Sequence, residues 1–360
     1  MAARGWPHWA AVGVVVWSAA YGAAGAWWTL GGAGYPFAPI HEDRRSGSIL
    51  EGAPVAVVGP VMVALGVAGV IAGLLMTRES SRFRPLVIGF GWLAAVVMVV
   101  VVPDFTLLAV LAMWPALLVF AFTGVPGAQD GIGDILYWHR DHLILVFLAG
   151  VLIAVATIGY QRRTRGACPT CGRDDHPAPS WQSPARALTW GRRAVWLAVL
   201  STVPYEVTRI AWYLGWPLGI TDEFHAMMAN TPGMLEMGLT LALLSLGGAV
   251  LTHGLVSAWG ERYPRWLWFR AGRRVPPALA IIPATLVAVV LPPAGLMNFR
   301  TDLDMSSWAV NGPGMLWFGW AVGLAAATYA YYLRRRGQCT RCGRGASASE
   351  PTAASRVVGE

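Results

Sequence analysis

The chain contains eight apolar stretches of about twenty residues, and these constrain the fold more than any other feature. A helix rises about 1.5 Å per residue, so roughly 20 residues cross the hydrocarbon core of a bilayer. The stretches cover 9–30, 54–76, 85–103, 142–160, 194–214, 234–258, 277–297 and 313–333. Only 13% of the residues are charged, whereas about a quarter are charged in ordinary soluble domains. We therefore expect an all-α integral membrane protein with eight transmembrane helices, embedded in a lipid bilayer.

The distribution of arginine predicts the orientation of these helices. All 27 basic residues are Arg, and 22 of them fall on one side of the predicted membrane against four on the other. The arginine-rich segments are the N-terminus, 77–84, 161–193, 259–276 and the tail from Arg334. Because Lys and Arg are enriched in cytoplasmic loops, we expect a bacterial cytoplasmic membrane protein with both termini in the cytoplasm. The basic charge then needs no nucleic-acid partner.

A ninth apolar segment, 106–124, follows the third stretch almost directly. If it also crossed the membrane, the arginine-rich segment 161–193 would be forced to the outer side. We therefore expect a re-entrant or outer-leaflet segment, which must be buried against protein because its backbone is not hydrogen-bonded by water there.

Three motifs recur in the two halves of the chain, which indicates an internal duplication. The first motif is Tyr21-x6-Trp28-x-Leu30-Gly31, which recurs as Tyr205-x6-Trp212-x-Leu214-Gly215. The second is Ala154-x-Ala156-Thr157-x-x-Tyr160, which recurs as Ala325-x-Ala327-Thr328-x-x-Tyr331. The third is Cys168-x-x-Cys171-Gly172-Arg173, which recurs as Cys339-x-x-Cys342-Gly343-Arg344. We expect two tandem four-helix repeats, 1–173 (including 106–124) and 193–344, joined by a cytoplasmic linker 174–192 and followed by a disordered tail 345–360. Four helices per repeat give both repeats the same orientation, so they should be related by a pseudo-two-fold axis along the membrane normal.

These motifs, together with Gly34-Tyr35-Pro36-Phe37 and Pro217-Leu218-Gly219-Ile220, resemble an uncharacterised family of actinobacterial multi-pass membrane proteins. The resemblance covers nearly the whole chain and implies the architecture, but it implies no activity. One position departs from the family pattern: Gly25 stands where a basic residue is expected, whereas its second-half equivalent, Arg209, is kept.

The four cysteines, Cys168, Cys171, Cys339 and Cys342, form two Cys-x-x-Cys pairs on the predicted cytoplasmic side. Disulfides are disfavoured in that reducing compartment. Two such pairs supply four thiolates for a tetrahedral, structural zinc ion, and pseudo-symmetry would bring the equivalent helix ends to the same face. Unliganded surface turns and thiol redox chemistry are the alternatives.

Glu206 and Arg209 lie inside the fifth apolar stretch, where an unpaired charge is costly. At i and i+3 they share a helix face and can pair. We expect them either to bind substrate at the interface between the repeats, opposite the small-residue face of Gly22 and Gly25, or to form a buried ion pair that sets helix register.

The predicted outer side carries most of the acids and three histidines of interest, His139, His142 and His225. Imidazole and carboxylate are suitable ligands for a divalent transition metal. Acidic outer loops are also common simply because arginine is excluded from that side. An outer metal site is therefore one interpretation, and solvated loops are the other.

These sites lead to competing functional hypotheses. The first is a transporter-like or small-molecule-binding protein with its site between the repeats. The second is a non-catalytic membrane scaffold or sensor, whose zinc-clamped face binds a cytoplasmic protein. The third is a membrane enzyme that uses the outer acid and histidine cluster, although no established catalytic motif is present in the sequence.

Overall fold

The computed structural model describes residues 5–39, 47–78, 82–112, 114, 137–265, 268–300 and 304–345. In this part of the chain every regular element is a helix, which agrees with the all-α prediction. The first half holds α1 (Trp6–Thr29), α2 (Val55–Thr77), α3 (Arg84–Val96), the π-helix η1 (Val97–Val101) and α5 (Trp138–Thr164). The second half holds η3 (Ser180–Gln182), α6 (Pro184–Tyr213), α7 (Asp222–Asn230), α8 (Met234–Gly254), η4 (Ala258–Gly260), α9 (Pro277–Asn298), η5 (Met305–Ser307), α10 (Trp308–Met315) and α11 (Trp317–Arg335).

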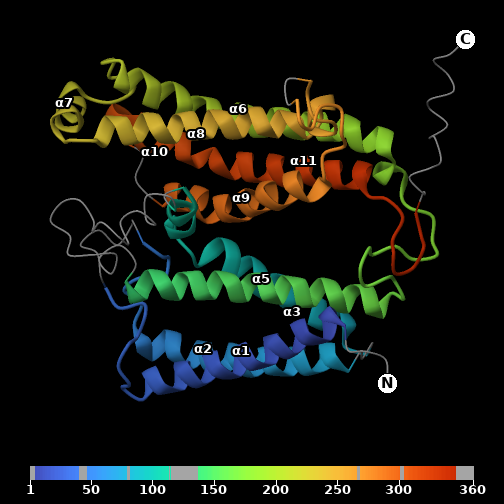
Figure 1. The fold of residues 1–360 in the computed structure, drawn as a ribbon. Coiled ribbons are helices and arrows are strands. Elements are labelled where there is room, and N and C mark those ends of the chain that lie inside the picture. Colours follow the sequence, from blue (N-terminus) through green and yellow to red (C-terminus); the bar gives the residue numbers. More distant parts are fainter. Residues whose placement is uncertain are drawn as a thin grey trace, which may run out of the picture.

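The long helices run roughly side by side in two groups, with α1, α2, α3 and α5 in one and α6, α8, α9 and α11 in the other (Figure 1). In the first half α1 packs against α2 and α5, and α3 packs against α5. In the second half α6 packs against α8 and α11, and α9 packs against α11. These three helix pairs of the first half thus each have a counterpart in the second half, and the halves contact each other where α9 meets η1.

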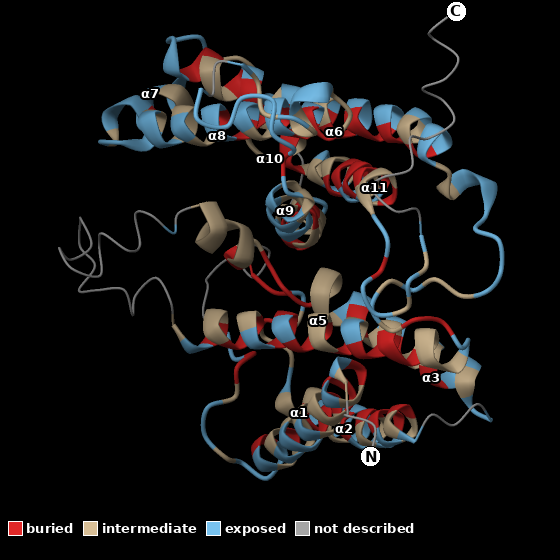
Figure 2. Ribbon diagram, turned by 45° about the vertical axis from the view of Figure 1, so that its right-hand side comes forward, coloured by how far each residue is buried: buried red, intermediate tan, exposed pale blue. Residues whose placement is uncertain are grey.

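Six of the described helices are long and apolar enough to cross a membrane: Trp6–Thr29, Val55–Thr77, Arg84–Val101, Trp138–Thr164, Met234–Gly254 and Pro277–Asn298. Their outward surfaces carry many large apolar side chains, such as Leu65 at 55% and Leu251 at 68% exposure. Buried positions gather on α11 and along α5, while α8 is mostly exposed (Figure 2). An apolar exterior of this extent needs lipid to cover it, which supports a membrane protein.

The repeated Trp-x-Leu-Gly motif forms the same helix end in both halves. After α1, the Gly31 N–H donates to the Trp28 carbonyl, and after α6 the Gly215 N–H donates to the Trp212 carbonyl, each at 3.1 Å. Gly31 has φ 89° and Gly215 has φ 84°. This left-handed conformation stops a helix and favours glycine, which explains the glycine in both copies of the motif.

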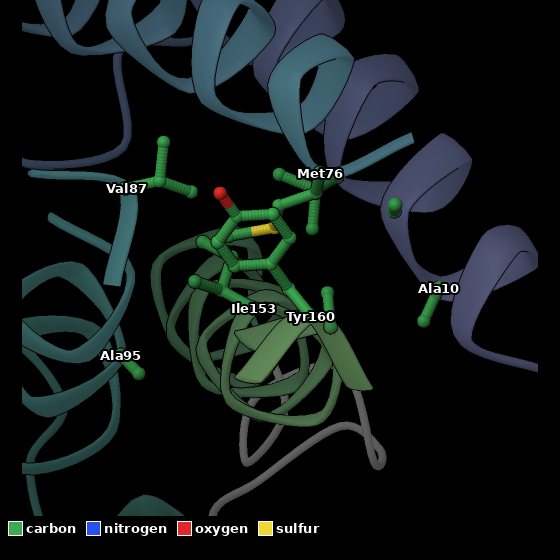
Figure 3. Close-up of a cluster of buried hydrophobic side chains, with 9 residues drawn as sticks. Ala10, Met76, Val87, Ala95, Ile153 and Tyr160 are labelled. Carbon is green, nitrogen blue, oxygen red and sulfur yellow. The ribbon is translucent and has the colours of Figure 1, made fainter. Parts of the chain in front are cut away.

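The repeated tyrosines, Tyr160 and Tyr331, occupy the centres of two separate hydrophobic cores, and both are fully buried. Figure 3 shows Tyr160 of α5 among Met76, Val87 and Ile153, side chains from three different helices. The Tyr331 hydroxyl donates to the Gly260 carbonyl at 2.8 Å. Each half thus has its own core around an equivalent residue.

Glycines allow α1 and α2 to approach backbone to backbone. A Cβ atom added at Gly66 would lie 2.6 Å from the Gly22 Cα and 2.8 Å from the Ser18 carbonyl oxygen. Small residues at such crossings are typical of membrane helices, where close packing replaces the hydrophobic effect between helices.

We expect Gly66→Ala to destabilise the protein by about 1–3 kcal/mol, because backbone atoms of α1 would have to move. Thermal unfolding of the purified protein in detergent measures this. Gly89→Ala is the matched control, since Gly89 lies in α3 and a Cβ there meets nothing within 4 Å. Equal melting temperatures for the two variants would contradict the close crossing.

Four predicted segments differ from the structure or lie partly outside the described residues. α6 begins at Pro184, with Ser183 as its N-cap, so half of the linker predicted over 174–192 is helical. The predicted span 313–333 is interrupted between α10 and α11. Residues 106–112 are helical, and the remainder of 106–124, apart from Trp114, lies outside the described residues, as does the tail from residue 346.

Candidate functional site

The two Cys-x-x-Cys pairs follow the ends of α5 and α11 and fold into the same turn. The Cys168 N–H donates to the Arg173 carbonyl at 2.9 Å, and the Gly172 N–H donates to the Cys168 carbonyl at 2.8 Å. The second copy repeats these bonds: Cys339 N–H to the Arg344 carbonyl at 2.9 Å, and Gly343 N–H to the Cys339 carbonyl at 2.8 Å. Gly172 and Gly343 have φ of 72° and 70°, which closes each turn in a conformation that favours glycine.

The tertiary fold brings all four sulfurs together. Cys168 Sγ lies 3.9 Å from Cys339 Sγ, and Cys171 Sγ lies 3.6 Å from Cys342 Sγ. All four Sγ atoms lie within 4.8 Å of one another. Four sulfurs at about 2.3 Å from a tetrahedral ion lie about 3.8 Å apart, so this arrangement fits one metal ion shared by both halves.

Two arginines join the turns around the cysteines. Arg173 Nη1 donates to the Arg344 carbonyl at 2.7 Å, and Arg344 Nη1 donates to the Arg173 carbonyl at 3.1 Å. Arg162, near the end of α5, donates to the Pro169 carbonyl at 2.8 Å and so holds the first turn against its helix. The arginine after each Cys-x-x-Cys-Gly therefore acts on the opposite turn.

Backbone amides prepare the cysteines to bind a cation. The N–H groups of Cys171 and Thr170 lower the pKa of Cys168 to about 6, and the N–H groups of Cys342 and Arg341 lower the pKa of Cys339. Burial raises the pKa of Cys171 to about 11 in the same cluster. Thiolates are the metal-binding form of cysteine, so the cluster already favours negative charge on Cys168 and Cys339. All four cysteines are free thiols.

The chain matches no protein-family model, no curated protein and no solved structure. The resemblance to actinobacterial multi-pass membrane proteins therefore stays a prediction, and the geometry of the sites carries the functional interpretation. At Gly25, where that resemblance expects a basic residue, an added Cβ would lie 2.7 Å from Met62 Cβ. A longer side chain does not fit between α1 and α2.

Arg209 is held by backbone carbonyls and aromatic rings. Its Nη1 donates to the Ala309 carbonyl at 2.6 Å, and its Nη2 donates to the Val310 carbonyl at 3.0 Å. The guanidinium lies 4.6 Å and 4.2 Å from the ring centroids of Tyr205 and Trp212.

A proline explains why one of these carbonyls needs an external donor. Pro313 lies in α10, four residues after Ala309, and has no N–H to donate to the Ala309 carbonyl. Arg209 supplies that donor from α6. Sequence reasoning missed this partnership, although a proline inside an apolar stretch is a signal that a carbonyl on the preceding turn needs a donor.

Glu206 has a different partner. Its Oε1 accepts from the Ser245 hydroxyl of α8 at 3.0 Å. In the first half the position equivalent to Glu206 is Gly22, which lies against Gly66 where α1 and α2 cross. The structure thus places Glu206 and Arg209 inside the second half, in contact with α8 and α10, rather than at the interface between the halves or in an ion pair with each other.

A small cavity of about 220 Å³ lies beside Arg209, lined also by Tyr205, Trp212, Met234 and Leu235. It is bounded by α6, α7 and α8, within the second half. The cavity beside Arg209 therefore lies within the second half, whereas the sequence predicted a site between the repeats.

The structure gives each outer histidine a separate partner. His139 Nδ1 donates to the Pro36 carbonyl at 2.5 Å, and His142 Nε2 lies 3.0 Å from the Tyr21 hydroxyl. His225 lies in α7 of the other half, with its Nε2 2.9 Å from the Trp212 carbonyl. Among the residues that the structure describes, only the four cysteines form a group of three or more ligands that could hold a metal. The i,i+3 spacing of His139 and His142 did place them on one face, but that face turns inward among aromatic rings.

Proposed function

We propose that the protein crosses a bacterial cytoplasmic membrane eight times, as two tandem four-helix units with both termini in the cytoplasm. Six apolar helices, the matching helix pairs of the two halves and the paired motif structures support this arrangement. The start of α1, the end of α5, the start of α6 and the end of α11 lie on one side of the molecule (Figure 1). That side carries the arginine-rich segments, which is the charge bias of a cytoplasmic face.

The function that the geometry supports best is that of a non-catalytic membrane scaffold or sensor, whose halves are clamped together by zinc on the cytoplasmic face. The observation that carries it is the gathering of four sulfurs from two distant segments within 4.8 Å. Four thiolates complete a tetrahedral shell and leave no open position for a substrate or a water molecule. A closed site of this kind stabilises a surface, and we infer that the surface it shapes binds a cytoplasmic protein.

Metal analysis of the purified protein tests this proposal. We expect about one zinc ion per chain in the wild type and less than a tenth of that in Cys168→Ser, because a structural zinc needs all four ligands. Thr170→Ala is the matched control, since Thr170 lies between the two cysteines and its side chain is exposed. The proposal fails if the reduced wild-type protein contains no metal and takes up none from added zinc.

A second candidate function, the binding of a small molecule, rests on the cavity of about 220 Å³ beside Arg209. In this alternative a transporter-like protein would use the arginine as a positive anchor for an anionic ligand. The hydrogen bonds of the guanidinium to two backbone carbonyls favour a structural role instead. The cycle of variants described in the Discussion distinguishes the two.

A further inference from the structure

A second and larger cavity, of about 820 Å³, forms a groove between α8 and α9 at the arginine-rich end of the second half. Its walls are almost entirely apolar. They include Leu251 of α8, Leu279, Pro283 and Val287 of α9, and Trp320 and Leu324 of α11. From Leu279 to Val287 the groove follows α9 for about 12 Å, at 1.5 Å per residue.

The groove faces the bilayer rather than the centre of the protein. α8 packs against α6, and α9 packs against α11, so the space between α8 and α9 is left to other molecules. In the first half the corresponding helices α2 and α3 contact each other. Leu251 and Leu279 on opposite walls are 68% and 59% exposed. In a membrane such a space is filled by lipid chains, because water and empty volume are both unfavourable there.

A basic hairpin forms the mouth of the groove. The Tyr263 N–H donates to the Arg273 carbonyl at 3.0 Å, and the Val275 N–H donates to the Glu261 carbonyl at 2.9 Å. Tyr263 and Val275 both line the groove. Five exposed arginines therefore lie on or next to its rim: Arg262, Arg265, Arg270, Arg273 and Arg274.

Acidic residues of the surrounding loop do not neutralise the arginines of this hairpin. Glu261 is the only acidic residue between 255 and 276, and it pairs with Arg334 at 2.5 Å and with Arg335 at 3.9 Å. Arg270 lies over the Tyr263 ring, 5.7 Å from its centroid, which places its guanidinium beside the mouth of the groove. The rim is thus an array of positive charges that attracts an anion.

The tip of the hairpin carries two strongly exposed aromatic residues, Trp268 at 90% and Phe269 at 77% exposure. Aromatic and basic residues together are typical of segments that lie at the headgroup level of an anionic membrane surface. An apolar surface that suits an acyl chain thus lies next to positive charges that suit a phosphate.

We propose that this groove binds an anionic phospholipid from the cytoplasmic leaflet. An acyl chain lies between α8 and α9, against Leu251 and Val287, and the phosphate contacts the arginines of the 262–274 hairpin. Basic pockets between membrane helices on the cytoplasmic side bind anionic headgroups by this combination of charge and apolar contact.

Native mass spectrometry of the delipidated protein, with phosphatidylglycerol or phosphatidylcholine added at equal concentration, tests the proposal. We expect the wild type to retain phosphatidylglycerol at least about tenfold more tightly. Arg273→Gln/Arg274→Gln should weaken its retention about tenfold. Arg78→Gln/Arg82→Gln, which removes the same charge from the equivalent loop of the first half, should leave it unchanged.

A second pair of variants tests the acyl-chain site. Ala284→Trp places a large side chain in the groove and should reduce phosphatidylglycerol retention, whereas Thr285→Trp, on the neighbouring exposed position, should not. Each variant is compared only if its melting temperature matches that of the wild type. Equal retention of the two lipids, equal losses from the two arginine pairs, equal losses from the two tryptophan variants, or competition by inorganic phosphate alone would each overturn the proposal.

Discussion

Removing the metal by chelation is expected to lower the melting temperature of the wild-type protein by roughly 5 °C. The four sulfurs come from segments that follow α5 and α11, so a shared ion ties the two halves together at one end. A metal present at a thousand times its dissociation constant stabilises the folded state by about 4 kcal/mol, which corresponds to a shift of this size. Differential scanning fluorimetry in detergent, before and after chelation, measures it.

The control for this effect is Cys339→Ser, which lacks one ligand and should show the lower melting temperature whether or not the chelator is present. Returning zinc should restore the wild type alone. If zinc is shown to leave the wild type and the melting temperature does not change, then the ion does not hold the halves together.

Replacing Arg209 with alanine is expected to destabilise the protein by about 2–4 kcal/mol. The substitution leaves the Ala309 carbonyl without a donor and removes the Arg209 bond to the Val310 carbonyl, and an unsatisfied buried polar group costs about 1–3 kcal/mol. It also removes the contacts of the guanidinium with Tyr205 and Trp212. Thermal unfolding of the purified variant measures the loss.

A double-mutant cycle with Pro313→Ala distinguishes this structural role from ligand binding. Alanine at position 313 restores an N–H that can donate to the Ala309 carbonyl within α10. Arg209→Ala should therefore cost about 1 kcal/mol less in the Pro313→Ala background than in the wild type. Additive effects would contradict the partnership and would favour the cavity beside Arg209 as a ligand site.

The apolar pattern predicted the long helices but not all of their ends. A hydropathy window detects the part of a helix that is apolar, so it places the start of the fifth stretch at residue 194 rather than at Pro184. Residues 184–193 include Arg186, Arg192 and Arg193, and they are helical because they extend α6 beyond its apolar part. In the last stretch, α10 ends at Met315 and α11 begins at Trp317, a boundary that the apolar pattern alone does not detect.

The cysteine site was predicted more fully than the surroundings of Glu206 and Arg209. The repeated Cys-x-x-Cys-Gly-Arg motif placed two similar turns at equivalent helix ends, and the structure brings their sulfurs together. Spacing on α6 also put Glu206 and Arg209 near each other, but the choice of partner depends on α8 and α10. Those helices lie tens of residues away in the sequence, so no local pattern identifies their carbonyls and hydroxyls.

The sequence alone determined that the chain is too apolar for a soluble domain and that its arginines are strongly biased to one side. It also determined two helix ends that stop at glycine and two Cys-x-x-Cys turns. These properties are local, because hydropathy, charge and backbone conformation belong to individual residues and their near neighbours. Only the tertiary structure decided the distances among the four sulfurs, the partners of Arg209 and the open groove between α8 and α9. Such contacts join residues far apart along the chain, and their geometry follows from how the helices pack.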